Sequence, residues 1–222
     1  MGDFQIRSLI LQYGPDFLWG AFLTLRLSAL SMAIGLTIAI VLAGLQRSRH
    51  RTLPRIVKAY IEGIRNTPFL VQLYVVYFGL PTIGARLSPN EAALVALALN
   101  AGAYSTEIIR AGVDSIQRGL IEAAQSLGLK GLQIFRLIIL PPAVRAVYPA
   151  LTSQFMLVML NTSVASAIAA EELTAVSDNL ASSTFNTLGV YLIATVTYLA
   201  ISLIFSFLFR VGELILFPPQ TA

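Results

Sequence analysis

The sequence predicts an all-α membrane protein with five transmembrane helices. Of its 222 residues, 56% are hydrophobic and 12% are charged, and the mean hydropathy is +0.76. Soluble domains carry about twice this share of charged residues. Several apolar runs are long enough to cross a ~30 Å hydrocarbon core. As a single domain over residues 1–222, the chain is expected to span the bilayer at residues 17–45, 56–80, 91–111, 146–169 and 188–209.

Basic residues gather in the segments between these runs and set the expected orientation. The segment after the first run holds Arg47, Arg49, Arg51, Arg55 and Lys58. Further basic residues follow the third run, and Arg210 follows the fifth. Cytoplasmic segments carry an excess of lysine and arginine. We therefore expect the N-terminus outside and the C-terminus inside.

The first run, 17–45, follows a mixed segment, 1–16, that we expect at the membrane interface. Trp19 near its start is typical of interfacial aromatic residues. We interpret Arg26 as a side chain that extends to the outer membrane surface. The opening MGDFQIRSLI lacks the basic start and small-residue cleavage site of a signal peptide, so this span is expected to remain as an anchor.

The second run begins with a polar stretch. Glu62 and Arg65 are three residues apart and can meet on one helix face. Pro68 cannot donate a helix hydrogen bond and disfavours helix at Thr67. We expect residues 56–66 to form a helix at the cytoplasmic level and 67–80 to form a deeper, kinked part.

Asn100, Tyr104 and Glu107 lie on one face of the third span, because they are spaced by four and three residues. Polar side chains inside a span usually face the bundle interior or a water-filled path. Two structural alternatives stay open. Asn100 could make a hydrogen bond between helices, and Glu107 could pair with Arg110 or Arg118.

The fourth span carries a polar cluster of Asn161, Thr162 and Ser163. Such clusters occur in broken or water-lined helices, although simple helix packing would also explain them. The acidic loop that follows, with Glu171, Glu172 and Asp178, is expected to be external and to hold a short helix over 172–179. The fifth span ends at Arg210.

Residues 112–145 form the long loop between the third and fourth spans. The stretch 119–141, GLIEAAQSLGLKGLQIFRLIILP, is too polar for lipid and must lie outside the hydrocarbon. We expect two short helices here, joined near Gly128 and Gly131, where glycine permits a sharp turn.

This stretch resembles the EAA loop of the permease subunits of bacterial ABC importers. The pattern is E-A-A, three residues, Gly, nine residues and Ile-x-Leu-Pro. It is met by Glu122, Ala123, Ala124, Gly128, Ile138, Leu140 and Pro141. The resemblance implies a cytoplasmic coupling helix that docks into a groove on an ATPase subunit. An ordinary amphipathic connector is the alternative.

A second stretch is similar to the polar amino acid branch of that family, the histidine/glutamine/arginine-type permeases. RNTPFLVQ, at 65–72, resembles the signature R-G-T-P-L-L-V-Q, with Asn66 in place of the usual glycine. LNAGAYSTEIIRAG, at 99–112, resembles the third span of the same family. The resemblance implies that Asn100 and Glu107, on the polar face of the third span, contribute to a substrate site. The other candidates for the substrate path are Tyr104 on the same face, Thr67 and Gln72 of the signature, and Asn161 and Ser163 of the polar cluster. An uncharged Asn161 removes one charged contact that some family members have.

The resemblance also implies partners. They are a second permease subunit (the same or a related chain), two ABC ATPase subunits, an extracytoplasmic solute-binding protein and a polar amino acid, all at a bacterial inner membrane. We expect no catalytic residue, cofactor, metal or nucleic acid. The chain has no cysteine and its one histidine is His50. It also lacks a G-x-x-x-x-G-K-[ST] phosphate loop, so ATP hydrolysis is expected on a separate subunit.

Three alternatives remain at this stage. A permease of the same branch could carry an opine or another small nitrogen compound. A secondary transporter or channel would explain polar residues within spans but not the EAA pattern. A membrane-embedded enzyme would need a nucleophile and a base, and only a reaction at Glu107 is formally open to it.

Overall fold

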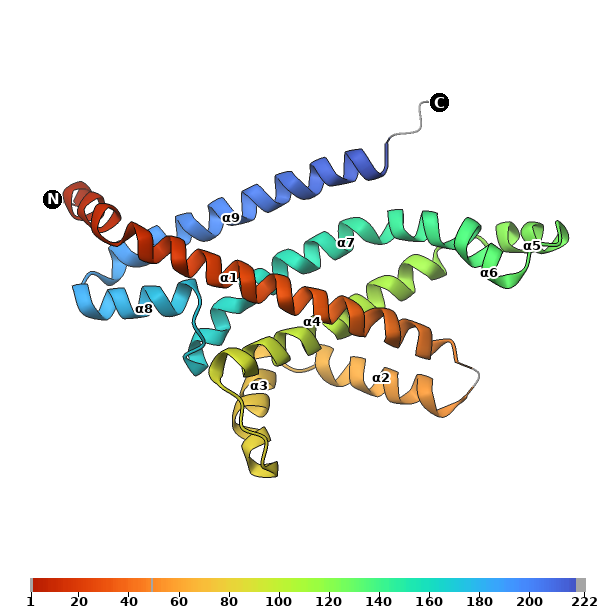
Figure 1. Cartoon of the computed structure of the whole chain (residues 1–222), viewed down its shortest axis with the longest axis horizontal. Helices are drawn as coiled ribbons and strands as arrows, with labels where there is room; N and C mark the ends of the chain where they lie inside the picture. Colours follow the sequence, from red (N-terminus) through yellow and green to blue (C-terminus); the bar gives the residue numbers. More distant parts are fainter. Residues whose placement is uncertain (1, 49, 219–222) are drawn as a thin grey trace.

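The protein is an elongated bundle of helices (Figure 1). The computed structural model describes residues 2–48 and 50–218, and these residues contain helices and connecting turns but no strand. Arg49, which the sequence places in the first basic segment, and the last residues of the expected inner terminus, 219–222, lie outside the described residues. The all-α prediction is confirmed.

The helices follow one another with short connections. The first half contains α1 (Gly2–Gln46), α2 (Thr52–Arg65), α3 (Phe69–Tyr74), the π-helical turn η1 (Val75–Gly79), the 3₁₀ turn η2 (Leu80–Ile83) and α4 (Pro89–Asp114). The second half contains α5 (Arg118–Ser126), α6 (Gly131–Gln133), the π-helical turn η3 (Ile134–Ile139), α7 (Leu140–Asn161), the 3₁₀ turn η4 (Thr162–Ile168), α8 (Leu173–Thr184) and α9 (Thr187–Leu216).

Four helices in the described part of the chain are long and apolar enough to cross a membrane, against the five that we expected. They cover Arg7–Gln46, Pro89–Asp114, Gly131–Ile168 and Thr187–Leu216. The expected span at 56–80 is divided instead into α2 and a shorter apolar helix, Phe69–Ile83. Pro68 causes the break, because it donates no backbone hydrogen bond and holds the chain in an extended conformation before α3.

The fourth spanning helix is longer than the expected 146–169. It begins at Gly131, so its first turns lie within the loop that we expected over 112–145. Pro141 and Pro142 sit in the first turn of α7 and do not end the helix. Prolines lack the N–H that an α-helical turn would require, and the π-helical turn η3 directly before them accommodates this change in bonding.

The core of the bundle lies around α4, which packs against α1, α2 and α7. One face of α4 is lined with alanines, including the fully buried Ala92, Ala93 and Ala101. Small side chains allow helix backbones to approach closely, as in other membrane bundles. A Cβ added at Gly35 of α1 would lie 2.7 Å from the Cβ of Ala101 and 3.1 Å from the backbone nitrogen of Gly102. α1 and α4 therefore cross with no room for a methyl group at Gly35.

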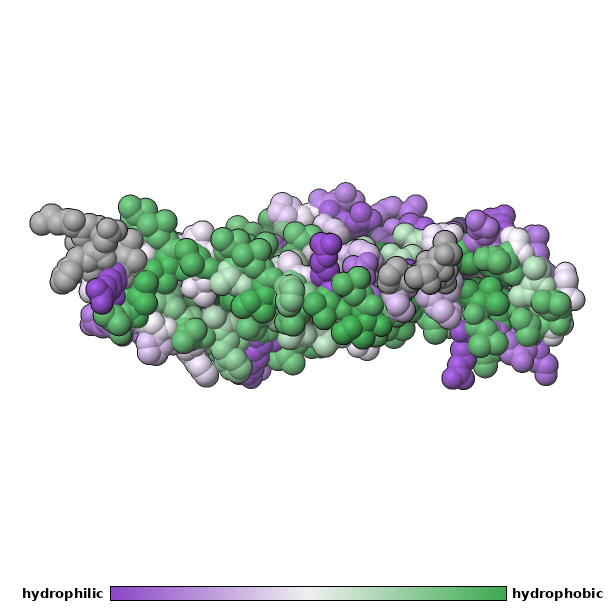
Figure 2. All heavy atoms as spheres, turned by 90° about the horizontal axis from the view of Figure 1, so that it is seen from above, coloured by the Kyte–Doolittle hydropathy of each residue, from purple (hydrophilic) through white to green (hydrophobic). Residues whose placement is uncertain are grey.

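Apolar side chains cover much of the outer surface of the bundle. Figure 2 shows hydrophobic residues over a large part of one face. On α9, they include Leu192, Val196, Leu199, Leu203 and Phe207, all exposed. A contiguous apolar surface of this kind is unusual in a soluble monomer and is typical of helices that face lipid or a partner.

Substituting Gly35 by alanine should destabilise the bundle by about 1–3 kcal/mol, because the added methyl group overpacks the crossing of α1 and α4. Gly44→Ala is the matched control. It lies on the same helix with nothing within 4 Å of an added Cβ, and it should be neutral or slightly stabilising. Thermal unfolding in detergent measures both, and equal melting temperatures would contradict the close crossing.

Candidate functional site

Gln72 holds the two parts of the broken second segment together. Its Nε2 donates to the carbonyl oxygens of Ile64, at 2.7 Å, and Thr67, at 2.9 Å, and lies 3.0 Å from Thr67 Oγ1. The amide thus adds hydrogen bonds to carbonyl groups at the C-terminal end of α2, where the regular helical donors end before Pro68. Thr67 and Gln72, both expected on a substrate path, are brought together at this break.

Asn100 of α4 joins the same network. Its Nδ2 donates to Gln72 Oε1 at 2.9 Å, and both side chains are buried. The hydrogen bond between helices that we considered for Asn100 is therefore present. Both amides sit beside the core cluster that contains Leu73, Leu97 and Ala101. In an apolar core, a hydrogen bond between two buried amides is stronger than in water and fixes how the two side chains pack.

Asn161 and Ser163 lie where α7 passes into the 3₁₀ turn η4. η4 contacts both α3 and α4. The Ser163 hydroxyl donates to the carbonyl of Leu160 at 2.7 Å. Within the described residues, no hydrogen bond links Asn161 or Ser163 to Gln72 or Asn100. The expected set therefore comes from α3, α4, the end of α7 and η4, with Thr67 just before α3, but its members are not all in direct contact.

Tyr104 and Glu107 belong to a second, charged cluster nearer the end of α4. Arg65 lies over the Tyr104 ring, 5.5 Å from its centroid, and 3.7 Å from the Glu107 carboxylate. Arg110 pairs with Glu107 at 2.8 Å and with Asp114 at 3.1 Å. The alternative pairing of Glu107 with Arg110 is present, whereas Arg65 pairs with Glu107 rather than with Glu62. This cluster lines a hollow of about 470 Å³ between α4 and α7.

Glycine shapes the turn that follows α5. The N–H of Leu129 donates to the Ala124 carbonyl at 3.1 Å, and the N–H of Gly128 donates to Gln125 at 2.9 Å. These two bonds form a Schellman motif, in which the residue after the C-cap adopts a left-handed conformation. Gly128 has φ +77°, which side-chain-bearing residues rarely adopt. The glycine of the EAA pattern thus ends α5 and turns the chain into the helix that begins at Gly131.

The hairpin of α5 and the helix from Gly131 stands at one end of the molecule, beyond the main bundle (Figure 1). Ala124 is buried and, with Ile134, holds the two helices together. Glu122 and Ala123 are exposed beside it. Of the other EAA positions, Ile138 lies in η3, and Leu140 and Pro141 begin α7.

Large apolar side chains on this hairpin are exposed, although α5 and the turn after it lie outside the spanning helices. Leu127 is 82% exposed, Leu132 78% and Leu120 53%. The literal EAA match did not single out these leucines. The sequence could have indicated them, because they are large apolar residues within an otherwise polar segment. An exposed apolar patch with a polar surround is typical of a protein–protein contact.

Two further groups were missed from the sequence. Arg65 connects α2 to Tyr104 and Glu107 on the polar face of α4. Its position in the stretch RNTPFLVQ could have marked it as a candidate site residue. Glu172 was expected in an exposed acidic loop, yet it is fully buried as the N-cap of α8. Its carboxylate accepts from the Tyr198 hydroxyl at 2.5 Å and from the Ala175 N–H at 2.8 Å. Burial raises the pKa of the Glu172 carboxyl.

A sequence model of the family described as "Binding-protein-dependent transport system inner membrane component" matches residues 35–213. The nopaline transport system permease protein of Agrobacterium fabrum is 34% identical, with 96% of this chain and 93% of that protein covered. The octopine transport system permease protein of Rhizobium meliloti is 37% identical, with 94% and 92% covered. The glutamine transport system permease protein of Escherichia coli K12 is 37% identical, with 88% and 90% covered.

Solved structures show the same fold. A crystal structure of an amino acid ABC transporter with histidines matches with a TM-score of 0.87 at 34% identity, covering 92% of this chain and 95% of that one. The MetNI methionine ABC transporter in an inward-facing conformation matches with a TM-score of 0.76 at 21% identity, covering 92% and 97%.

Substituting Gly128 by alanine should open the α5 hairpin, since a left-handed conformation destabilises an L-residue by about 1–2 kcal/mol. Hydrogen exchange at the amides of Gly128 and Leu129 should become faster while that of α4 is unchanged. Gly119→Ala, in the first turn of α5, has nothing within 4 Å of an added Cβ and is the control. Unchanged exchange in Gly128→Ala would show that the turn does not depend on glycine.

Proposed function

Since the chain belongs to the family of binding-protein-dependent transport system inner membrane components, and is thus an ABC importer permease subunit, we propose that it carries polar amino acids. In this proposal it forms one half of a translocation path across a bacterial inner membrane. A second copy or a related permease supplies the other half. Two ATPase subunits and an extracytoplasmic solute-binding protein complete the importer.

The α5 hairpin carries the proposal, because it presents exposed apolar side chains on α5 and on the first turn of the helix that follows. They are Leu120, Leu127 and Leu132, and Glu122 of α5 is exposed as well. In the proposal, this surface docks into a groove of the ATPase subunit. The Schellman turn at Gly128 fixes the direction in which α5 points. The same end of the bundle holds Arg47, which pairs with Asp114 at 2.7 Å. The basic residues here support the assignment of this end to the cytoplasm.

The buried Gln72–Asn100 pair is our candidate for contact with the substrate. Amide groups donate and accept hydrogen bonds, so they can bind both the ammonium and the carboxylate of an amino acid. Glu107 is the weaker candidate for binding a substrate ammonium. It already pairs with Arg110 and lies near Arg65, and a substrate would have to displace these cations. Tyr104, Asn161 and Ser163 stay candidates for the walls of the path.

An opine is the second candidate substrate. The observation that favours it is that two relatives, at 34% and 37% identity, are named nopaline and octopine permeases. Relatives named for glutamine are equally similar. The competing substrates share an amino acid carboxylate, so the same amide pair could serve either of them.

The proposed mechanism alternates between two states. ATP binding closes the ATPase dimer, and the docked α5 hairpins move with it. The two permease subunits then expose the path to the outside, and hydrolysis returns them to the inward-facing state. Such coupling requires that ATP and the solute-binding protein bind the two states with different affinity.

Leu127→Gln should reduce the amount of ATPase subunit that purifies with the permease by about tenfold, because a buried leucine contributes about 1.5 kcal/mol or more at an interface. Phe185→Gln is the control. Phe185 is 94% exposed and follows α8, at the other end of the molecule. Quantitative mass spectrometry of the tagged complex gives the subunit ratio. Full retention of the ATPase in Leu127→Gln would count against docking at this hairpin.

Asn100→Ala should raise the KM for uptake by about tenfold, since a lost hydrogen bond in a buried site amounts to about 1–3 kcal/mol. Thr106→Val on the same helix is the control, because the Thr106 hydroxyl donates to the carbonyl of Gly102 in its own helix and, among the described residues, to no other helix. Uptake of radiolabelled glutamine in competition with histidine, arginine and octopine identifies the substrate class. An unchanged KM in Asn100→Ala would remove the amide pair from the path.

A further inference from the structure

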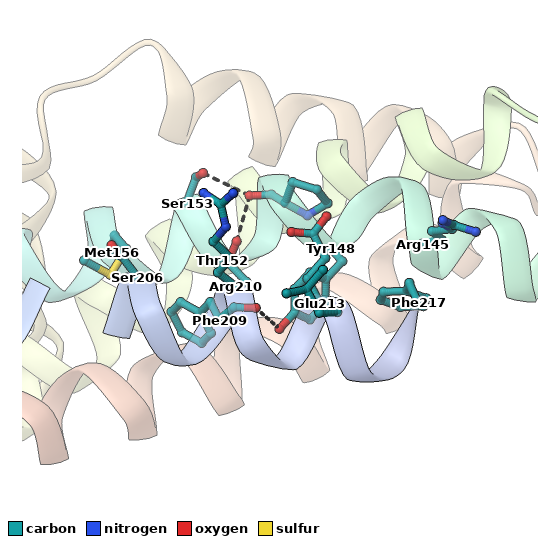
Figure 3. Close-up of a pocket in the computed structure, with 12 residues that line it drawn as sticks. Arg145, Tyr148, Thr152, Ser153, Met156, Ser206, Phe209, Arg210, Glu213 and Phe217 are labelled. Carbon is teal, nitrogen blue, oxygen red and sulfur yellow. Dashed lines mark hydrogen bonds between the residues drawn. The ribbon is translucent and has the colours of Figure 1, made fainter. Parts of the chain in front are cut away.

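A groove of about 510 Å³ runs between α7 and α9 (Figure 3). Its walls combine charged, hydroxyl and apolar side chains. They include Arg145, Tyr148, Met156, Arg210, Glu213 and Phe217. A wall of this mixed character suits a ligand that is partly charged and partly apolar.

The groove is separate from the candidate substrate path. α7 buries Val147, Gln154 and Val158 on the side that packs against the bundle. The groove residues Pro149, Thr152 and Met156 fall on the other side of the same helix, given 100° of rotation per residue. Polar ligands that pass Gln72 and Asn100 would therefore not enter this groove.

Two arginines line the groove without a carboxylate partner. Within the described part of the chain, neither Arg145 nor Arg210 forms an ion pair, and Glu213 forms none either. Figure 3 shows the two arginines at separate places along the groove, with Glu213 between them. Two cations against one carboxylate leave the groove with a net positive charge.

Three of the four hydroxyl groups that line the groove already donate elsewhere. Thr152 and Ser153 both donate to the carbonyl of Pro149 at 2.9 Å, and Tyr148 donates to the carbonyl of Phe209 at 3.0 Å. The guanidinium groups are thus the main donors left for a ligand. One guanidinium group can donate two parallel hydrogen bonds to two oxygens of a phosphate group. Arginine is therefore a preferred partner of phosphate.

The surroundings of the groove are those of a lipid-facing surface. Leu203, Phe207 and Leu208 of α9 are exposed next to it, and Leu214 and Phe217 line it. Acyl chains can lie along this apolar surface while the headgroup lies in the groove. Basic pockets between spanning helices, at the membrane surface, bind anionic lipid headgroups in this way.

We propose that the groove between α7 and α9 binds a phospholipid with two phosphate groups, one at Arg145 and one at Arg210. Two separated arginines favour such a lipid over one with a single phosphate, which reaches only one of them. This assignment rests on the groove and the membrane location, and it holds whichever substrate the protein carries.

Native mass spectrometry of the complex, isolated through a tag on this chain, tests the proposal. The complex is incubated with cardiolipin, with phosphatidylglycerol or with phosphatidylcholine, each with oleoyl chains. Cardiolipin should be retained most strongly. Arg145→Gln/Arg210→Gln should weaken cardiolipin binding by about thirtyfold, since each arginine near a membrane surface adds about 1 kcal/mol.

Arg51→Gln/Arg55→Gln removes the same charge from an exposed part of α2 and its N-cap and should leave cardiolipin binding unchanged. Glu213→Gln should strengthen binding, because it removes the carboxylate that competes with phosphate. Because Glu213→Gln keeps both arginines, its result does not depend on whether the arginine double variant folds. The proposal is overturned if both double variants weaken binding equally, if phosphatidylglycerol binds as well as cardiolipin, or if free inorganic phosphate displaces the lipid.

Discussion

The narrow surface of α4 sets the distances between the helices around it. Its alanines and glycines let the α1 backbone come close enough that a methyl group at Gly35 would collide with Ala101. In lipid, helices gain little from burying apolar area, so close packing and hydrogen bonds hold them together. The Gln72–Asn100 bond lies next to this crossing. The same close packing thus stabilises the bundle and fixes the position of its buried amides.

Much of the fold could be predicted from composition and periodicity. Long apolar runs predicted spanning helices. The spacing of Asn100, Tyr104 and Glu107 predicted that their side chains share one face of α4. Helix boundaries were harder to predict. Pro68, in an extended conformation, separates α2 from α3, whereas Pro141 and Pro142 lie in the first turn of α7. Proline alone does not distinguish these outcomes, since a π-helical turn can absorb the missing hydrogen bonds.

The contacts of the candidate site were less predictable than its residues. Pattern and resemblance selected Gln72 and Asn100, but not the fact that they bond to each other. Glu107 was expected on a path and is held by Arg110 and Arg65. Arg65 lies more than forty residues away in sequence, and only the packing of α2 against α4 brings it near. Burial of Glu172 likewise depends on α8 folding back onto α1 and α9, and no local pattern indicates that.

A helical path runs from Gly131 to Ile168 through η3, α7 and η4. At 1.5 Å per residue the 22 residues of α7 alone measure ~33 Å, about the thickness of the hydrocarbon core. One end begins at the α5 hairpin and the other ends in η4, which contacts α3 and α4. The hairpin and the neighbourhood of Asn161 are therefore joined by one helical backbone that reaches from one side of the membrane to the other.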